Sequence, residues 1–235
     1  MIRASVKLPM NPMPLTIFDL DNTLLDGDSD YLWGRHLVEL GVVGGSSYEA
    51  ANQRFYEDYR AGRLDIMAFL AFSLRPLAEN DPAELERWRA DFIKRHIRPL
   101  IGQPARALVG SHRRAGDTLL IITATNRFVT EPIAALFGIE HLIATEPEQH
   151  NGRFTGRVTG IPSFREGKIA HLHDWLAQTG HSLAGATFYS DSHNDLPLLE
   201  LIDHPVAVDP DEALRAHAEQ AGWPIISLRD HATTA

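Results

Sequence analysis

Residues 14–23 of the chain read Pro-Leu-Thr-Ile-Phe-Asp-Leu-Asp-Asn-Thr. The segment begins as a short apolar run and ends in two acidic residues, Asp19 and Asp21. A short apolar run of this kind is typical of a buried strand. Two carboxylates at the end of a strand can face one site, where one attacks a substrate and the other moves protons. Their oxygens are also ligands that Mg²⁺ prefers. The simpler alternative is an acidic loop that caps the following helix.

The segment after this strand is expected to be helical. Apolar residues at helical spacing predict helices that run from Tyr31 toward Gly44, over 48–59, over 64–77, and from Pro82 toward His96. No convincing strand lies between Leu24 and Leu100. A helical block that follows the first strand indicates a lid over the carboxyl edge of a sheet, where open α/β sheets bind ligands.

After Pro104 the pattern alternates between helix and strand. We predict strands over 118–123, 186–190, 205–208 and 224–227, and helices over 105–115, 129–137, 164–179, 195–201 and 211–221. Asn151-Gly152, between 142–145 and 153–158, predicts a hairpin of those two segments. We therefore expect an α/β fold: a Rossmann-like doubly wound parallel sheet as core (1–28 and 104–235), a helical cap (29–103) and a small β-hairpin.

A second acidic pair, Asp191 and Asp195, follows the predicted strand 186–190. Ser192 or Asn194 could instead serve only as the N-cap of the next helix. Because the carboxyl ends of parallel strands meet at one edge of a sheet, pairing with the first acidic cluster favours metal binding.

Two further segments could hold a phosphate group. Thr123 ends a strand and is followed by residues 124–126, so its hydroxyl, the nearby backbone N–H groups and Asn126 can bind phosphate oxygens at a strand-to-helix junction. Lys168 lies near the start of a predicted helix, and a lysine is a compact cation suited to phosphate. Taken alone, the first pattern also fits a helix N-cap and the second a solvated surface lysine.

Composition excludes several classes of protein. The net charge of -9 disfavours nucleic acid and anionic membrane surfaces as partners. The chain has no cysteine, which excludes disulfides and thiolate chemistry and fits a cytoplasmic protein. No apolar stretch is long enough to span a membrane, and residues 1–14 lack the apolar core of a signal peptide.

The order of these motifs carries the most information. The strand with D-x-D-x-T, the long helical insert, the strand ending in Thr123, the helix-borne Lys168 and the strand with D-x-x-x-D follow one another along the chain. From about Leu15 onward the chain thus resembles the haloacid dehalogenase superfamily, and its insert resembles the cap of the phosphoserine-phosphatase-like branch. The resemblance implies a Mg²⁺-dependent phosphatase that hydrolyses a small phosphomonoester through an aspartyl phosphate.

The resemblance also assigns roles to the acidic residues. Asp19 is expected to attack phosphorus, and Asp21 to protonate the leaving alcohol and then deprotonate water. Mg²⁺ is expected to be held by the Asp19 carboxylate, the Asp21 backbone carbonyl and Asp191. Asp195 is expected to support the metal shell and the lysine.

The same resemblance bears on the substrate. It assigns phosphate binding to Thr123 and Lys168. Asp28, nine positions after the nucleophile, matches a residue that binds the substrate amine in phosphoserine phosphatases, and Asp30 is close by. Ser73 falls where those enzymes carry an arginine for the substrate carboxylate, but Arg54, Arg60 and Arg75 are nearby, and any of them could face the site instead. An amine site without a carboxylate site favours an amino-alcohol phosphate such as histidinol phosphate, although Asp28 and Asp30 could also form only a solvated acidic hinge.

Three alternatives stay open at this point. The substrate could be phosphoserine. A phosphotransferase could use the same site and pass the phosphoryl group to a second alcohol. The chain could also be a non-catalytic protein that binds a phosphorylated ligand. The sequence does not predict the oligomeric state.

Overall fold

The computed structural model describes residues 13–229. The expectation that the chain has no signal peptide concerns residues 1–14, most of which lie outside this part. The strands are β1 (Leu15–Phe18), β2 (Thr118–Asn126), β3 (His141–Thr145), β4 (Pro147–His150), β5 (Arg153–Val158), β6 (Thr187–Ser190), β7 (His204–Val208) and β8 (Ile225–Ile226). Six of them form one sheet in the order β3-β2-β1-β6-β7-β8. All pairings in this sheet are parallel, as predicted.

The strand order places a switch point at β1. From β1 the chain adds β2 and β3 on one side, and β6, β7 and β8 on the other. Loops that leave the carboxyl ends of β1 and β6 therefore diverge, and open α/β sheets bind ligands in the crevice that this divergence creates. The acidic residues after these two strands lie at this crevice.

Helices cover both faces of the sheet. They are α1 (Ser29–Glu39), α2 (Gly45–Arg60), α3 (Ile66–Ser73), α4 (Arg75–Glu79), α5 (Pro82–Phe92), α6 (Gln103–Ala115), α7 (Arg127–Phe137), α8 (Glu166–Thr179), α9 (Leu196–Leu199) and α10 (Glu212–Ala221), with single turns η1 (Leu20–Leu24), η2 (Ile93–Ile97), η3 (Arg98–Leu100) and η4 (His193–Asp195). Leu15 and Ile17 of β1 pack with α8, α9 and α10, whereas Phe18 packs with α6 and α7. This alternation follows from the two-residue period of a strand, and it confirms the doubly wound fold.

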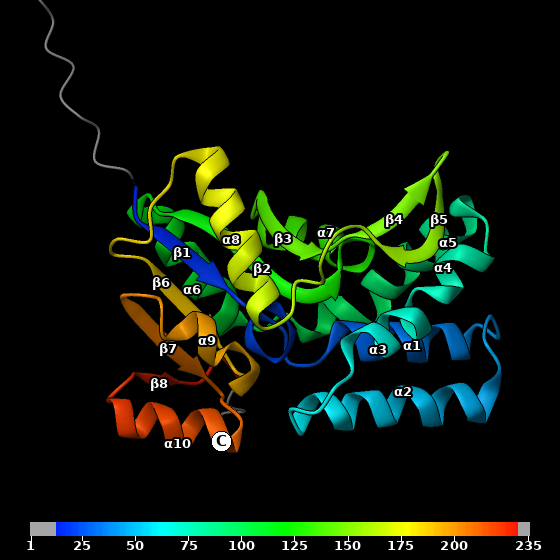
Figure 1. Cartoon of the computed structure of the whole chain (residues 1–235), viewed down its shortest axis with the longest axis horizontal. Coiled ribbons are helices and arrows are strands. Elements are labelled where there is room, and N and C mark those ends of the chain that lie inside the picture. Colours follow the sequence, from blue (N-terminus) through cyan, green and yellow to red (C-terminus); the bar gives the residue numbers. More distant parts are fainter. Residues whose placement is uncertain (1–12, 230–235) are drawn as a thin grey trace, which may run out of the picture.

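The helices between β1 and β2 lie beside the sheet. Figure 1 shows α1, α2 and α3 at the lower right and the sheet at the left and centre. The apolar cluster of the core continues into this insert, because Trp33 of α1 contacts Phe92 of α5 and Phe128 of α7 edge-on, at ring-centroid distances of 5.3 and 5.9 Å. The insert is thus anchored on the core through α1. The division into a core and a cap at residues 28–29 and 103–104 stays a prediction.

Three details of the sequence-based prediction are wrong. The hairpin turn does lie at Asn151-Gly152, but its first arm is β4 (Pro147–His150), whereas residues 142–145 belong to the parallel sheet. Asn151, at φ 51°, and Gly152, at φ 75°, supply the left-handed backbone that a tight turn requires. The apolar sequence His-Leu-Ile-Ala-Thr of β3 favours the buried sheet, and the polar sequence Pro-Glu-Gln-His favours the exposed arm.

The helix predicted over 64–77 is two helices, α3 and α4, which meet at Leu74. Pro76 lacks the N–H that would continue the hydrogen-bond ladder, and it occupies the first turn of α4 instead. The last strand is also shorter than predicted, with only Ile225 and Ile226 paired. Among residues 13–229, no helix is both long and apolar enough to cross a membrane.

Candidate active site

The carboxyl ends of β1 and β6 bring Asp19 and Asp191 together. The backbone N–H of Asp19 donates to Tyr189 O at 2.9 Å, which fixes the end of β1 against β6. Thr23 Oγ1 lies 3.3 Å from Asp19 Oδ2 and 3.0 Å from Asp191 Oδ1, and it accepts the Asp191 N–H at 3.0 Å. Thr23 therefore orients the carboxylates of both Asp19 and Asp191, although Asp191 lies 168 positions further along the chain.

Lys168 reaches the same place from α8. Its Nζ lies 2.8 Å from Asp19 Oδ1 and 2.7 Å from Asp195 Oδ1, and Ser190 Oγ donates to Asp195 Oδ2 at 2.7 Å. Burial alone would lower the pKa of the Lys168 ammonium, but the carboxylates of Asp19 and Asp195 raise it above its ordinary value. Lys168 is thus a permanent buried cation and not a surface lysine.

Asp19 has the properties of a protected nucleophile. Burial raises the pKa of its carboxyl to about 7, and Lys168 opposes this shift by favouring the ionised form. The side chain lines a pocket together with Thr123, whose hydroxyl accepts the backbone N–H of Thr125 at 3.2 Å. A substrate in this pocket would therefore lie beside both Asp19 and Thr123.

The carboxylate of Asp21 is oriented by two hydrogen bonds. The backbone N–H of Ser29 donates to its Oδ1 at 2.6 Å, and Thr125 Oγ1 donates to its Oδ2 at 2.7 Å. Burial raises the pKa of the Asp21 carboxyl, and these two hydrogen bonds partly oppose the shift. A carboxyl with a raised pKa and a fixed orientation can carry a proton to and from a bound substrate.

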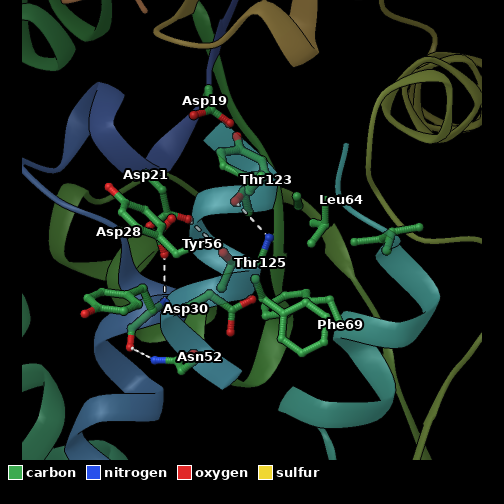
Figure 2. A pocket seen from close by; sticks show the side chains of 15 residues that line it. Asp19, Asp21, Asp28, Asp30, Asn52, Tyr56, Leu64, Phe69, Thr123 and Thr125 are labelled. Carbon is green, nitrogen blue, oxygen red and sulfur yellow. Dashed lines mark hydrogen bonds between the residues drawn. The ribbon is translucent and has the colours of Figure 1, made fainter. Parts of the chain in front are cut away.

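The pocket continues from Asp19 toward α1 and α2. Figure 2 shows Asp19 at one end of the view and Asp30 and Asn52 toward the other. The wall on this side is largely aromatic and aliphatic, and its members come from the insert: Tyr31, Phe55, Tyr56, Tyr59, Leu64, Ile66 and Phe69.

Asp28 and Asp30 both line this pocket. Asp28 is the N-cap of α1 and accepts the N–H of Tyr31 at 2.8 Å, and burial, followed by the charge of Asp21, raises its pKa to about 7. Oδ1 of Asp30 is buried and has no hydrogen-bond partner among residues 13–229, and burial, followed by the charge of Asp28, raises the pKa of Asp30 well above the ordinary value. Two acidic groups thus face a pocket whose lining, within residues 13–229, contains no lysine or arginine.

Two further residues considered from the sequence, Asn126 and Ser73, are not among the residues that line the pocket. Asn126 is buried, and its Oδ1 accepts the N–H of Val129, so the side chain caps α7; its assignment to phosphate stays a prediction. Ser73 is buried in α3 with an unpartnered Oγ, and it is not among the residues that line the pocket.

Thr125 and Tyr56 line the pocket but were not predicted from the sequence as site residues. Thr125 could have been found, because it lies two positions after Thr123 and side chains two apart on a strand share a face. Tyr56 gave no such signal, because its place at the pocket depends on how α2 lies against the core.

A contact network keeps the insert against the core. Nδ2 of Asn194 donates to Tyr59 O at 3.2 Å, Nε of Arg165 donates to Asn194 Oδ1 at 3.1 Å, and Nη2 of Arg165 donates to Gly62 O. A Cβ added to Gly62, whose φ is 68°, would lie 2.5 Å from Nε2 of His193. Only glycine allows the end of α2 to approach the loop after β6 this closely.

The charge beside Asp19 suits a divalent cation. Asp19, Asp191 and Asp195 are buried, and within the described residues their ion pairs involve one cation, Lys168. Burial, followed by the charge of Asp19, raises the pKa of Asp191 well above its ordinary value. This uncompensated negative charge, presented by carboxylate oxygens, fits Mg²⁺. The Asp21 carboxylate is engaged in hydrogen bonds with Ser29 and Thr125, and the use of its backbone carbonyl for Mg²⁺ stays a prediction.

Comparison with known proteins identifies the family. The model of haloacid dehalogenase-like hydrolases matches residues 16–200. The chain belongs to this family. Members generally use Mg²⁺ and form an aspartyl phosphate, and this family member is a phosphatase.

Individual relatives cover most of the chain. A histidinol-phosphatase of Neisseria meningitidis is 48% identical over 92% of this chain and 99% of its own length. A phosphoserine phosphatase of Mycobacterium tuberculosis is 30% identical over 94% of this chain and 73% of its own length. A crystal structure of a protein of unknown function from Bordetella pertussis superposes with a TM-score of 0.88 at 43% identity, over 93% of this chain and 100% of that one.

Proposed function

We propose that this phosphatase hydrolyses the phosphate ester of an amino alcohol, with histidinol phosphate as its substrate and Mg²⁺ as its cofactor. The relative with 48% identity is named a histidinol-phosphatase, and the similarity extends over nearly the whole of both chains. The pocket beside Asp19 supplies the independent physical support.

The observation that carries the proposal is the unpaired acidic end of the pocket. Asp30 has a buried oxygen without a partner, and Asp28 lies beside it with a raised pKa. Buried carboxylates are costly unless they are paired. A substrate ammonium would satisfy Asp30 and would favour the ionised form of both carboxyl groups.

The remaining wall suits a planar ring. The rings of Tyr31 and Tyr56 stack at 4.9 Å, and those of Phe55 and Phe69 meet edge-on at 5.5 Å. Both pairs include residues that line the pocket. An imidazole can stack on such a wall, whereas a smaller amino alcohol would leave it without a contact.

Phosphoserine fits this pocket less well. Its carboxylate needs a cation, and among residues 13–229 no lysine or arginine lines the pocket. The guanidinium of Arg60 lies over Tyr56 at 5.9 Å from the ring centroid but is not part of the lining. Asp28 and Asp30 would in addition repel the carboxylate.

The residues around Asp19 support the usual two-step hydrolysis. Oδ1 of Asp19 is paired with Lys168, so the second oxygen can attack phosphorus in line with the leaving alcohol. Asp21, held by Thr125, protonates the leaving oxygen and then takes a proton from the hydrolytic water. Thr123 and Lys168 bind the phosphate oxygens.

Asp19 and Asp191, with the Asp21 backbone carbonyl, would hold Mg²⁺, and Asp195 would keep Lys168 in place. The ion would neutralise the charge of the phosphate as the anionic nucleophile approaches. The insert would act as a cap that excludes water and selects the organic group. A cytoplasmic location, suggested by the cysteine-free sequence, stays a prediction.

Release of inorganic phosphate from a panel of esters tests the proposal. The panel comprises histidinol phosphate, phosphoserine, phosphoethanolamine, which has the ammonium but no ring, and glycerol phosphate, which has neither. Wild type, Asp19→Asn and the control Asp174→Asn, an exposed residue of α8, are assayed with Mg²⁺ and with EDTA. We expect Mg²⁺-dependent release that is highest for histidinol phosphate, is lost in Asp19→Asn and is unchanged in Asp174→Asn.

Other outcomes separate the alternatives. A preference for phosphoserine would contradict the proposed substrate and leave the phosphatase activity intact. Phosphoryl transfer to added alcohols in place of phosphate release would indicate a transferase. A wild type that binds these esters without any turnover would indicate a non-catalytic phosphate-binding protein.

A further inference from the structure

A second set of metal-ligating side chains lies within the insert. His36 and Glu39 are three positions apart on α1, so they share one side of the helix, and His96 of η2 packs against them. One nitrogen of each histidine and one carboxylate oxygen of Glu39 all lie within 4.8 Å of one another. Within residues 13–229, these are the only three His, Cys, Asp or Glu side chains that gather in this way.

His36 already has the tautomer of a metal ligand. Its side chain is fully buried, and Nε2 lies 3.1 Å from the backbone oxygen of Trp88. Because a carbonyl oxygen only accepts, Nε2 must carry the proton, which leaves the lone pair on Nδ1. Nδ1 is buried and has no hydrogen-bond partner in the part of the chain that the structure describes. Metal-bound histidines commonly donate their other ring nitrogen to a backbone carbonyl in this manner.

His96 also offers a ring nitrogen to the cluster. Within residues 13–229 its buried Nε2 has no hydrogen-bond partner, and it lies 3.4 Å from Glu39 Oε2. The rings of His36 and His96 are 5.0 Å apart. Two imidazoles this close would repel each other if both were protonated. Burial, followed by the neighbouring His96, lowers the pKa of His36.

The surrounding charges leave room for a cation. Nη2 of Arg95 lies 3.8 Å from Glu39 Oε2, and Nη1 lies 3.2 Å from Asp91, so the arginine is paired more closely with Asp91. Asp91 also lies 3.9 Å from Nε2 of His36, where it supports the protonated nitrogen. A cation between the three side chains would give a partner to Nδ1 of His36 and to Nε2 of His96, neither of which has a hydrogen-bond partner among the described residues.

From this geometry we propose that His36, Glu39 and His96 bind one transition-metal dication of the Zn²⁺ type, at a site separate from the Mg²⁺ position beside Asp19. Two imidazole nitrogens and one carboxylate suit Zn²⁺ and are not the all-oxygen set that Mg²⁺ prefers. The ion would join the end of α1 to η2. Because α1 begins at the residues that line the acidic end of the pocket, the site would stabilise the scaffold of the cap and take no part in the chemistry.

Calorimetric titration with Zn²⁺ tests the site directly. The full chain, without an affinity tag and freed of metals by EDTA dialysis, is titrated in excess Mg²⁺ so that the position beside Asp19 is filled. The variants are His96→Gln and Glu39→Gln, whose side chains are partly exposed, with His173→Gln and Glu49→Gln as exposed controls. Circular dichroism checks that each variant is folded, and Co²⁺ replaces Zn²⁺ to give a visible spectrum.

We expect wild type and both controls to bind one equivalent of Zn²⁺, and each site variant to bind it at least tenfold more weakly. The visible band of bound Co²⁺ should weaken in the same variants, while Mg²⁺-dependent phosphate release is kept. The proposal is overturned if wild type binds no Zn²⁺ in excess Mg²⁺. It is equally overturned if the folded His96→Gln and Glu39→Gln variants bind Zn²⁺ as tightly as wild type.

Discussion

The two ends of the pocket differ in how their charges are satisfied. At the core end, Asp19, Asp195 and Lys168 form ion pairs of 2.8 and 2.7 Å, and Thr23 bridges to Asp191. At the cap end, Asp30 keeps an oxygen without a partner. The side chains of the core end are held in place by contacts within the protein, although their excess negative charge still fits a cation. At the cap end, the oxygen of Asp30 has no such contact within the described residues.

We therefore expect the core end of the pocket to carry out the reaction and the cap end to select the substrate. Preorganised groups around the proposed nucleophile need no rearrangement as the reaction proceeds, which favours the transition state. An unpaired buried carboxylate favours the ligand that completes it and rejects one that does not. Substitutions at the core end should therefore affect every substrate, and substitutions at the cap end should affect only those with an ammonium group.

Lys168→Met should produce the largest effect. It leaves Asp19 and Asp195 as buried carboxylates without a counter-ion, which typically costs about 3–5 kcal/mol of stability. The free energy of unfolding, measured by urea denaturation, should fall by this amount, and turnover of every substrate should be lost. Lys94→Met, an exposed position on η2, is the matched control. An unchanged stability of Lys168→Met would show that the core end is not organised by this cation.

Asp30→Asn should affect substrates selectively. A hydrogen bond to a charged group contributes about 1.5–3 kcal/mol, so kcat/KM for histidinol phosphate should fall roughly 10- to 100-fold. For glycerol phosphate, which has no ammonium, kcat/KM should change by less than about twofold, since no charged partner is lost. An equal fall in kcat/KM for both esters would show that Asp30 takes part in catalysis. It would contradict the proposed difference between the core end and the cap end of the pocket. Asp174→Asn should change neither value.

The metal-free protein should lose stability as the pH rises. The pKa of Asp19 and that of Asp28 are about 7, above the value of 3.8 for an ordinary aspartate, so the folded state binds more protons between these limits. Stability is therefore highest at low pH and falls as pH rises through 7, by about 1 kcal/mol or more between pH 6 and 8.

Thermal unfolding in EDTA at a series of pH values measures this dependence. Mg²⁺ should reduce the fall, because it favours ionised Asp19, and Asp28→Asn should remove part of it. A stability that rises with pH in EDTA would mean that these carboxyl groups are ionised in the folded protein without metal.

Thr125→Val should have the smallest effect. It removes the hydroxyl that donates to Asp21 Oδ2 at 2.7 Å while it keeps the shape of the side chain. Loss of one such bond costs about 1 kcal/mol, or roughly fivefold in kcat. Because the bond favours the ionised carboxyl, the pKa of Asp21 and the corresponding limb of the pH–rate profile should move upward. Thr125→Ser, which keeps the hydroxyl, should restore the wild-type profile.

The sequence by itself determined the elements whose signals are local. The apolar run 14–18 and the start of a helix at Pro82 each depend on neighbouring residues, and the structure has a strand and a helix start there, as predicted. Parallel strands then bring Asp19 and Asp191 to one edge, because their carboxyl ends must meet there.

The tertiary structure alone decided the rest. Residues 142–145 could have formed either a hairpin arm or a buried strand, and only packing beside β2 selected the second. The unpartnered oxygen of Asp30 within the described residues depends on how α1 packs in the fold. The contact of Thr125 with Asp21 depends on how η1 lies beside β2, across 104 positions of sequence. Local patterns fix which residues are polar or apolar, but which of them meet is set by packing between distant segments.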